Sequence, residues 1–144
     1  MTKKDKGPIP QGLYRAAVRD GMTIQTSGMT PRRGNELVFE GCVGKDDDPA
    51  VHREAVRLAT SNALSALRLH MREGERVIVF LHLAVFIATE PGFTRHATLA
   101  DYASELLSEE CGEDTIGSRA AIGVVSLPSN APVEIVLNAK LDLQ

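Results

Sequence analysis

The sequence has few aromatic residues and no excess of basic ones. Only six of its 144 residues are Phe or Tyr, and its 16 Lys and Arg are outnumbered by 19 Asp and Glu, for a net charge of -3. Binding to a phosphate backbone or an anionic membrane needs clustered Lys and Arg, and single-stranded RNA also needs aromatic platforms. We therefore expect no nucleic-acid partner and no affinity for a membrane surface.

Long hydrophobic segments are also absent. The longest apolar run, residues 77–88, has 12 residues and includes His82. A helix that crosses a bilayer needs about 20. The run predicts a buried strand instead, and we expect no membrane partner.

Patterns that hold metals, disulfides or phosphates are missing too. Cys42 and Cys111 form no CxxC pair and nothing at the N-terminus resembles a signal peptide, so we expect a reduced, cytoplasmic protein. The four histidines lie in different segments without paired-ligand spacing, and glycine-rich phosphate motifs are absent. We expect no metal and no other cofactor.

Composition and periodicity divide the chain into one domain and a short leading segment. Residues 1–11 are rich in Lys, Gly and Pro and predict a flexible N-terminal segment, while 12–144 predict a single domain. Asp48 suits a helix N-cap and Pro49 the first helical position. The predicted strands are 13–19, 22–27, 36–40, 76–88, 118–126 and 132–141, and the predicted helices run from Pro49 to near Gly74 and over 93–111.

The resulting order, βββαβαββ, predicts an α+β layer. The strand-helix-strand portions should form right-handed parallel crossovers that place both helices on one face of the sheet. The opposite face then carries apolar residues that nothing in the chain covers. Self-association is the simplest way to cover it.

Two charged residues stand in otherwise apolar strands. Arg119 and Glu134 lie within 117–134, and a buried guanidinium or carboxylate costs several kcal/mol unless it is paired. Each therefore implies a partner, either within the protein or from a ligand. If Arg119 and Glu134 paired only with each other, the site would be structural.

Several motifs together resemble the RidA/YjgF/YER057c/UK114 family over about residues 12–141. The likeness is especially close to the branch labelled endoribonuclease L-PSP-like or chorismate-mutase-like, and 119–134 is its most specific part. The motifs are Gly12-Leu13-Tyr14, Gly21 with Ser27-Gly28, Gly41-Cys42-Val43-Gly44, residues 55–67, Phe86 with Phe93, residues 118–124, Leu127-Pro128 and Val133-Glu134-Ile135.

The resemblance implies a fold, an assembly and an activity. The fold is Bacillus-chorismate-mutase-like, a six-stranded mixed sheet with two helices on one face and the last strand inserted beside the central one. The assembly is a homotrimer whose sheets form a barrel, with clefts between subunits. RidA-type members hydrolyse enamine and imine intermediates to 2-keto acids and ammonia without a cofactor, as 2-iminobutanoate/2-iminopropanoate deaminases.

The same resemblance implies roles for single residues. Arg119 stands where the family arginine binds the substrate carboxylate, and its planar fork suits bidentate capture. Glu134 matches the glutamate that holds or activates water. Tyr14 matches the tyrosine at the cleft edge, and Ser27 and Gly28 match the residues that line the pocket.

The sequence departs from the family pattern at three positions. Ala121 occupies the place of a cysteine in RidA-type deaminases, Asp101 falls near a common asparagine, and Met29 replaces a frequent glutamine. Asp101 and Ala121 are therefore placed in the substrate pocket, whose polarity is altered. An Asp101 close to Arg119 would pair with it and compete with a carboxylate substrate, or favour a less anionic ligand.

Other interpretations stay open beside these. Arg119 and Glu134 are also compatible with structural ion pairs at an interface, and Tyr14 with packing on the sheet. For the whole protein, the alternative to an imine hydrolase is a noncatalytic trimer that binds a small carboxylate-bearing metabolite. Endoribonuclease activity is a third, less favoured interpretation.

Overall fold

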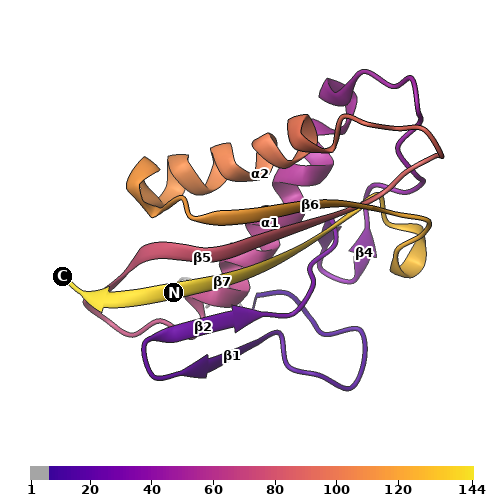
Figure 1. Cartoon of the computed structure of the whole chain (residues 1–144). Coiled ribbons are helices and arrows are strands. Elements are labelled where there is room, and N and C mark those ends of the chain that lie inside the picture. The colour runs from indigo at the N-terminus through magenta and orange to yellow at the C-terminus, as the bar shows by residue number, and fades with distance from the viewer. Residues whose placement is uncertain (1–6) are drawn as a thin grey trace.

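The structure, a computed structural model, describes residues 7–144 and is built on one five-stranded sheet. All neighbouring strands run antiparallel except β5 and β6, which are parallel, and β7 is inserted between β2 and β5 (Figure 1). In sheet order the strands are β1 (Ala17–Asp20), β2 (Thr23–Thr26), β7 (Val133–Leu143), β5 (Glu75–Ala88) and β6 (Ser118–Val124). The predicted fold class and the inserted last strand are confirmed.

The predicted third strand does not join this sheet. Only Glu36–Leu37 (β4) are extended, and they pair with Arg32–Arg33 (β3) in a separate two-stranded hairpin, so the six-stranded sheet of the prediction has five strands. The side chain of Asn62 explains the difference. Its Nδ2 donates to the carbonyls of Thr30 at 3.0 Å and Arg32 at 2.8 Å, which ties the hairpin to the first helix rather than to the sheet edge.

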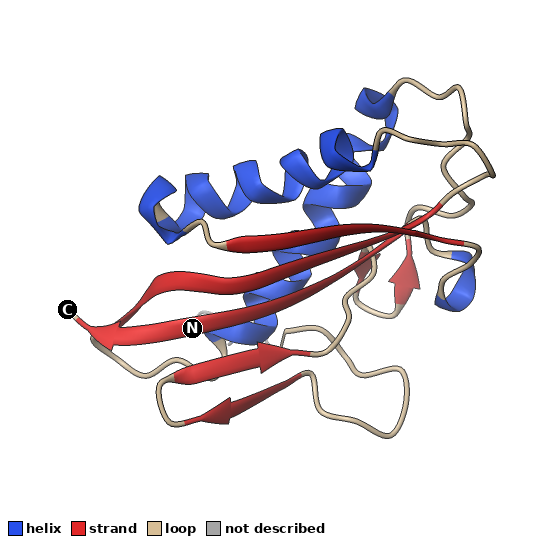
Figure 2. Ribbon diagram, viewed as in Figure 1, coloured by secondary structure: helices blue, strands red, loops and turns tan. Residues whose placement is uncertain are grey.

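Two helices cover one face of the sheet (Figure 2). A short 3-10 turn, Pro49–His52, precedes α1 (Arg53–Arg68), and the Asp48 carboxylate accepts from the Ala50 amide at 3.0 Å as the predicted cap. The second helix, α2, is His96–Cys111. The predicted first helix thus begins with the 3-10 turn and ends at Arg68 rather than near Gly74, and α2 begins three residues later than predicted. Their buried residues include Ala55, Ala59, Ala63, Leu67, Leu99, Ala103 and Leu107.

The other face of the sheet is not covered by any described residue. Neighbours in register share a face, so one row across it reads Val18, Gln25, Asn138, His82 and Ser118. This row is more polar than the sequence pattern predicts, although Val18 is 57% exposed. Because the helices cover only one face, the open face is the surface on which we expect a partner subunit.

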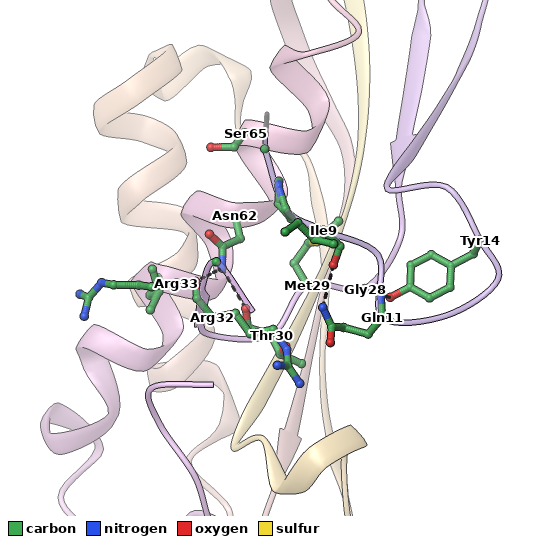
Figure 3. Close-up of a pocket in the computed structure, with 14 residues that line it drawn as sticks. Ile9, Gln11, Tyr14, Gly28, Met29, Thr30, Arg32, Arg33, Asn62 and Ser65 are labelled. Atoms are coloured by element: carbon green, nitrogen blue, oxygen red, sulfur yellow. Dashed lines mark hydrogen bonds between the residues drawn. The ribbon is translucent and has the colours of Figure 1, made fainter. Parts of the chain in front are cut away.

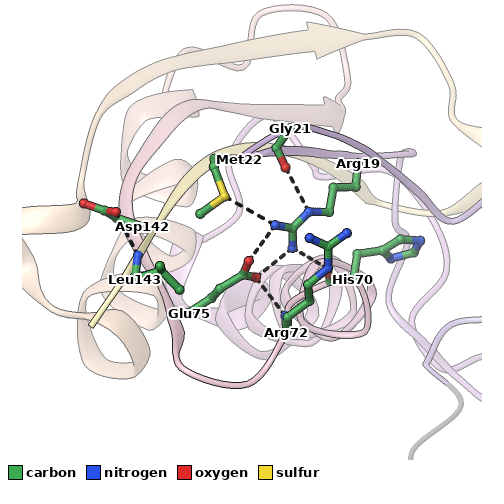
Figure 4. A network of polar contacts seen from close by, with 8 residues as sticks. All are labelled: Arg19, Gly21, Met22, His70, Arg72, Glu75, Asp142 and Leu143. Carbon is green, nitrogen blue, oxygen red and sulfur yellow. Dashed lines mark hydrogen bonds and ion pairs between the residues drawn. The ribbon is translucent and has the colours of Figure 1, made fainter.

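A nearly buried ion pair joins the N-terminal hairpin to the start of β5 (Figure 4). The Arg19 guanidinium donates through Nη2 and Nη1 to the Glu75 carboxylate at 2.6 and 2.7 Å. Only 11% of the Arg19 side chain and 4% of the Glu75 side chain are exposed. Hydrogen bonding from Arg19 and from the Arg72 amide lowers the pKa of Glu75 to about 2.

Two absences hold for residues 7–144. None of the helices there has the length and apolar character needed to cross a membrane. No three His, Cys, Asp or Glu side chains of that range gather where they could hold a metal ion. The predicted flexible segment 1–11 falls largely on residues 1–6, which lie outside the described range.

Candidate functional site

Arg119 faces the helices from the outermost strand of the sheet. It is paired with Leu83 of β5, whose buried side chain marks the helix-covered face. Gly117 brings β6 this close to β5, because a Cβ at that position would overlap the backbone of Phe80. The guanidinium of Arg119 therefore meets α2 and not the open face.

The Arg119 guanidinium has an acidic partner on α2. Its Nη1 donates to Asp101 Oδ1 at 2.8 Å and to Ser104 Oγ at 3.1 Å. Its Nε and Nη2 make no hydrogen bond with any residue of the described range. The partner that the sequence implied is thus Asp101, and part of the guanidinium remains available to a ligand.

Ala121 lies two residues further along β6 and on the same face. It is paired with Val85 of β5 and packs partly against the hydrophobic core. The methyl group offers neither a nucleophile nor a hydrogen-bond donor at this position. Any chemistry on this side of β6 therefore depends on Arg119 and its neighbours.

Glu134 faces the opposite side of the sheet. It is paired with Phe86 of β5, in the half of β7 that lies near the β2–β3 loop. Its side chain is half-buried and forms no hydrogen bond or ion pair within residues 7–144. Burial raises the pKa of the Glu134 carboxyl above its ordinary value of 4.5.

Gly28 makes room for Glu134. The backbone of Met29 exchanges two hydrogen bonds of 2.8 Å with Ile135, and this antiparallel bridge makes Gly28 a diagonal neighbour of Glu134 on the same face. A Cβ on Gly28 would stand 2.7 Å from Glu134 Cδ and 2.9 Å from its Cγ. The glycine is needed for this close approach and not for its backbone conformation.

Replacing this glycine tests the packing. We expect Gly28→Ala to lower the free energy of unfolding by about 0.5–1.5 kcal/mol, because the added methyl forces the Glu134 side chain into another conformation. Urea denaturation measures the change. In the Gly28→Ala/Glu134→Ala double variant the clash is gone, so most of the loss should disappear. Strictly additive losses would contradict this packing.

Tyr14 and Gly28 line a cavity of about 200 Å³ on the helix side of the β2–β3 loop. Figure 3 shows Tyr14 and Gln11 on one side of it and Asn62 and Ser65 of α1 on the other. The Tyr14 hydroxyl accepts from the Gln11 amide at 3.0 Å, and Tyr14 is 47% exposed. Tyr14 is not among the described residues that pack against the hydrophobic core.

Ser27 does not reach this cavity with its hydroxyl. Ser27 Oγ donates to the carbonyl of Arg15 at 2.6 Å, and the residue borders a shallow groove over Val18 and Gln25. The hydroxyl is occupied in holding the two ends of the β1–β2 hairpin together. Gly28, and not Ser27, is the member of the predicted Ser-Gly pair that touches both the cavity and Glu134.

The predicted site residues thus form two groups. Arg119, Asp101 and Ala121 lie on the helix-covered face at β6. Glu134 lies on β7 and faces the open side of the sheet, with Gly28 and Tyr14 on the segments next to β2 and β1, and β5 separates β7 from β6. One chain does not bring Arg119 and Glu134 together, and the two do not pair with each other.

No family model matches the sequence. Solved structures and a curated relative do resemble the chain. A protein of unknown function from Agrobacterium tumefaciens is 30% identical in sequence. The alignment covers 90% of this chain and 82% of that protein, with a TM-score of 0.81. A putative endoribonuclease from Shewanella oneidensis is 26% identical over 96% and 91% of the two chains, with a TM-score of 0.83. Protein TCP17 of Trypanosoma cruzi is 29% identical over 128 residues, 88% of this chain and 79% of that protein.

The same fold recurs in the YjgF gene product of E. coli, at 20% identity, 93% and 92% coverage and a TM-score of 0.64. The chain belongs to the RidA/YjgF/L-PSP family. The structure shows where two of the residues that differ from the RidA/YjgF/L-PSP pattern lie. Asp101 contacts Arg119 directly, whereas Met29 is buried in the core, 7% exposed, and offers no polar group to a ligand.

Sequence reasoning missed several residues around both groups. Ser104 shares the Arg119 Nη1 donor with Asp101, and its place one turn after Asp101 on α2 was the available signal. Asn62 and Arg32 line the cavity beside Tyr14. The signal for Asn62 was a polar residue on the apolar face of α1, while nothing in the sequence pointed to Arg32.

Proposed function

We propose that the protein is a cytoplasmic hydrolase that converts reactive enamine or imine intermediates to 2-keto acids and ammonia. The observation that carries the proposal is the state of Glu134. Its carboxyl is half-buried and unpartnered within the described residues, and burial raises its pKa. A general base works best when its pKa approaches the working pH, and an unpartnered carboxylate is free to hold a water molecule.

Arg119 supplies the second function that this chemistry needs. Its unpaired Nε and Nη2 can donate to the two oxygens of a substrate carboxylate. A charge-assisted hydrogen bond of this kind contributes roughly 1.5–3 kcal/mol. The carboxylate would thereby fix the imine carbon relative to the water that Glu134 directs.

We further propose that the active assembly is a homotrimer with its sites between subunits. Arg119 and Glu134 lie on opposite faces of one sheet, so a complete site calls for Arg119 of one protomer and Glu134 of its neighbour. The uncovered sheet face offers a surface for that contact. Light scattering should give a mass three times that of the chain, and a stable monomer would contradict the arrangement.

The activity is tested with imino acids generated enzymatically in situ. Purified protein should accelerate keto-acid release. The rate should fall as the pH is lowered and Glu134 becomes protonated. Because the pKa of Glu134 is raised, the midpoint of this fall should lie above pH 4.5. Glu134→Gln should remove most of the acceleration, whereas Glu40→Gln, an exposed glutamate, should not. Rates equal to buffer for several imino acids would overturn the proposal.

One observation favours a second candidate, a noncatalytic protein that binds a small metabolite. Arg119 already pairs with Asp101, and Ala121 supplies no reactive group. E. coli TdcF, which shares the fold at 21% identity and a TM-score of 0.64, has been solved with bound serine. Calorimetry that gives saturable binding of amino or keto acids without turnover would favour this candidate.

RNA cleavage gains no support from a net charge of -3.

A further inference from the structure

The pairing of Arg119 with Asp101 leaves the arginine side of the site without net charge. Arg119 Nη1 contacts Asp101 Oδ1 at 2.8 Å, while Arg119 Nε and Nη2 and Asp101 Oδ2 have no partner within residues 7–144. The Asp101 side chain is 61% exposed and that of Arg119 27% exposed. A ligand that reaches the pair therefore meets unused donors directly beside an unused anionic acceptor.

We propose that Asp101 makes this site selective for zwitterions, small molecules in which a carboxylate stands next to a protonated nitrogen. The inference rests on the proposed function, whose site it uses. The ligand carboxylate accepts from the free nitrogens of Arg119, and the protonated nitrogen donates to the free oxygen of Asp101. All four charges are then paired. α-Amino acids and the iminium forms of α-imino acids have this arrangement of groups.

A carboxylate without a neighbouring cation fits the same site less well. It must place its negative charge on Arg119, next to the carboxylate of Asp101, which already shares that guanidinium. Two like charges separated by about 4–5 Å repel each other, and solvent screening at this exposed pair reduces but does not remove the effect. We expect a discrimination of about tenfold between a zwitterion and the matching monoanion.

The same charge arrangement distinguishes substrate from product. In the hydrolysis, the water oxygen forms a bond to the iminium carbon, the carbon–nitrogen bond breaks, and the nitrogen leaves as ammonium. An iminium acid of zero net charge plus water thus gives a 2-keto acid of charge -1 and ammonium of charge +1. The product has lost the group that Asp101 binds, so Asp101 favours the substrate and promotes release of the keto acid.

Calorimetry with two ligands of the same carbon skeleton tests the selectivity. 2-Aminobutyrate is the zwitterion and 2-oxobutyrate the monoanion. At low salt, the wild-type protein should bind the amino acid about tenfold more tightly. Asp101→Asn keeps a hydrogen-bond acceptor for Arg119 and should abolish or reverse this preference. Glu105→Gln removes a charge four residues further along α2 and should leave the preference unchanged.

The outcomes separate this inference from the proposed function. If Asp101→Asn leaves the ratio of the two affinities at the wild-type value, the selectivity is overturned, while binding that depends on Arg119 stands. If neither ligand binds to the wild type or to the variant, and keto-acid release is not accelerated, both the selectivity and the proposed function are overturned. Stronger product inhibition by 2-oxobutyrate in Asp101→Asn would support the role in release.

Discussion

Arg119→Ala is expected to lower kcat/KM for imino-acid hydrolysis by roughly 10- to 100-fold. The variant removes the charge-assisted hydrogen bonds to the substrate carboxylate, which contribute roughly 1.5–3 kcal/mol. Folding should be little affected, because the Arg119–Asp101 pair is partly exposed, and exposed pairs contribute about 0–1 kcal/mol. Steady-state kinetics and a thermal melt measure the two effects separately.

A control and a mixing experiment sharpen this prediction. Arg53→Ala removes an exposed arginine of α1 that pairs with the exposed Glu54, and should keep wild-type activity. If each site takes Arg119 from one protomer and Glu134 from its neighbour, Arg119→Ala and Glu134→Gln chains that are unfolded and refolded together should recover about a quarter of the wild-type activity. No recovery in proven mixed trimers would contradict the shared site.

Glu75→Gln is expected to lower the Tm by about 10 °C at pH 7, since it leaves the Arg19 guanidinium nearly buried without its anionic partner. Arg19 also donates to the carbonyls of Gly21 at 2.9 Å and His70 at 2.8 Å, so it cannot turn to solvent without breaking both. A thermal melt followed by circular dichroism measures the shift. Glu109→Gln is the matched control, because Glu109 pairs with Arg57 at the surface.

The same pair predicts a dependence of stability on pH. The pKa of Glu75 is lowered from 4.5 to about 2 in the folded chain, so the unfolded chain binds more protons between these values. The stabilisation by the pair is fully present above pH 4.5 and is lost as the pH falls towards 2. Wild type and Glu75→Gln should therefore converge in Tm over this range. A Tm difference that stays constant down to pH 2 would contradict the assignment.

The local elements follow closely from the sequence. The apolar run 77–88 lies in β5, an interior strand between β7 and β6, and the helix predicted from Pro49 to near Gly74 contains α1. The third strand was wrong because its residues pair within their own hairpin. That choice depends on the Asn62 side chain reaching two carbonyls of the 30–32 segment, a contact between distant residues that no local pattern records.

The sequence by itself determined that Arg119 and Glu134 are charged residues in apolar strands, and that Arg119 and Ala121 share a face, because strand side chains alternate. It could not determine which face each strand presents to the helices, because that depends on strand order and register. Only the tertiary structure decided that Arg119 meets Asp101 on α2 while Glu134 points to the opposite side, beside Gly28. The register is the physical reason: Arg119 pairs with Leu83 and Glu134 with Phe86, three residues apart on β5 and therefore on opposite faces, and β5 separates their two strands.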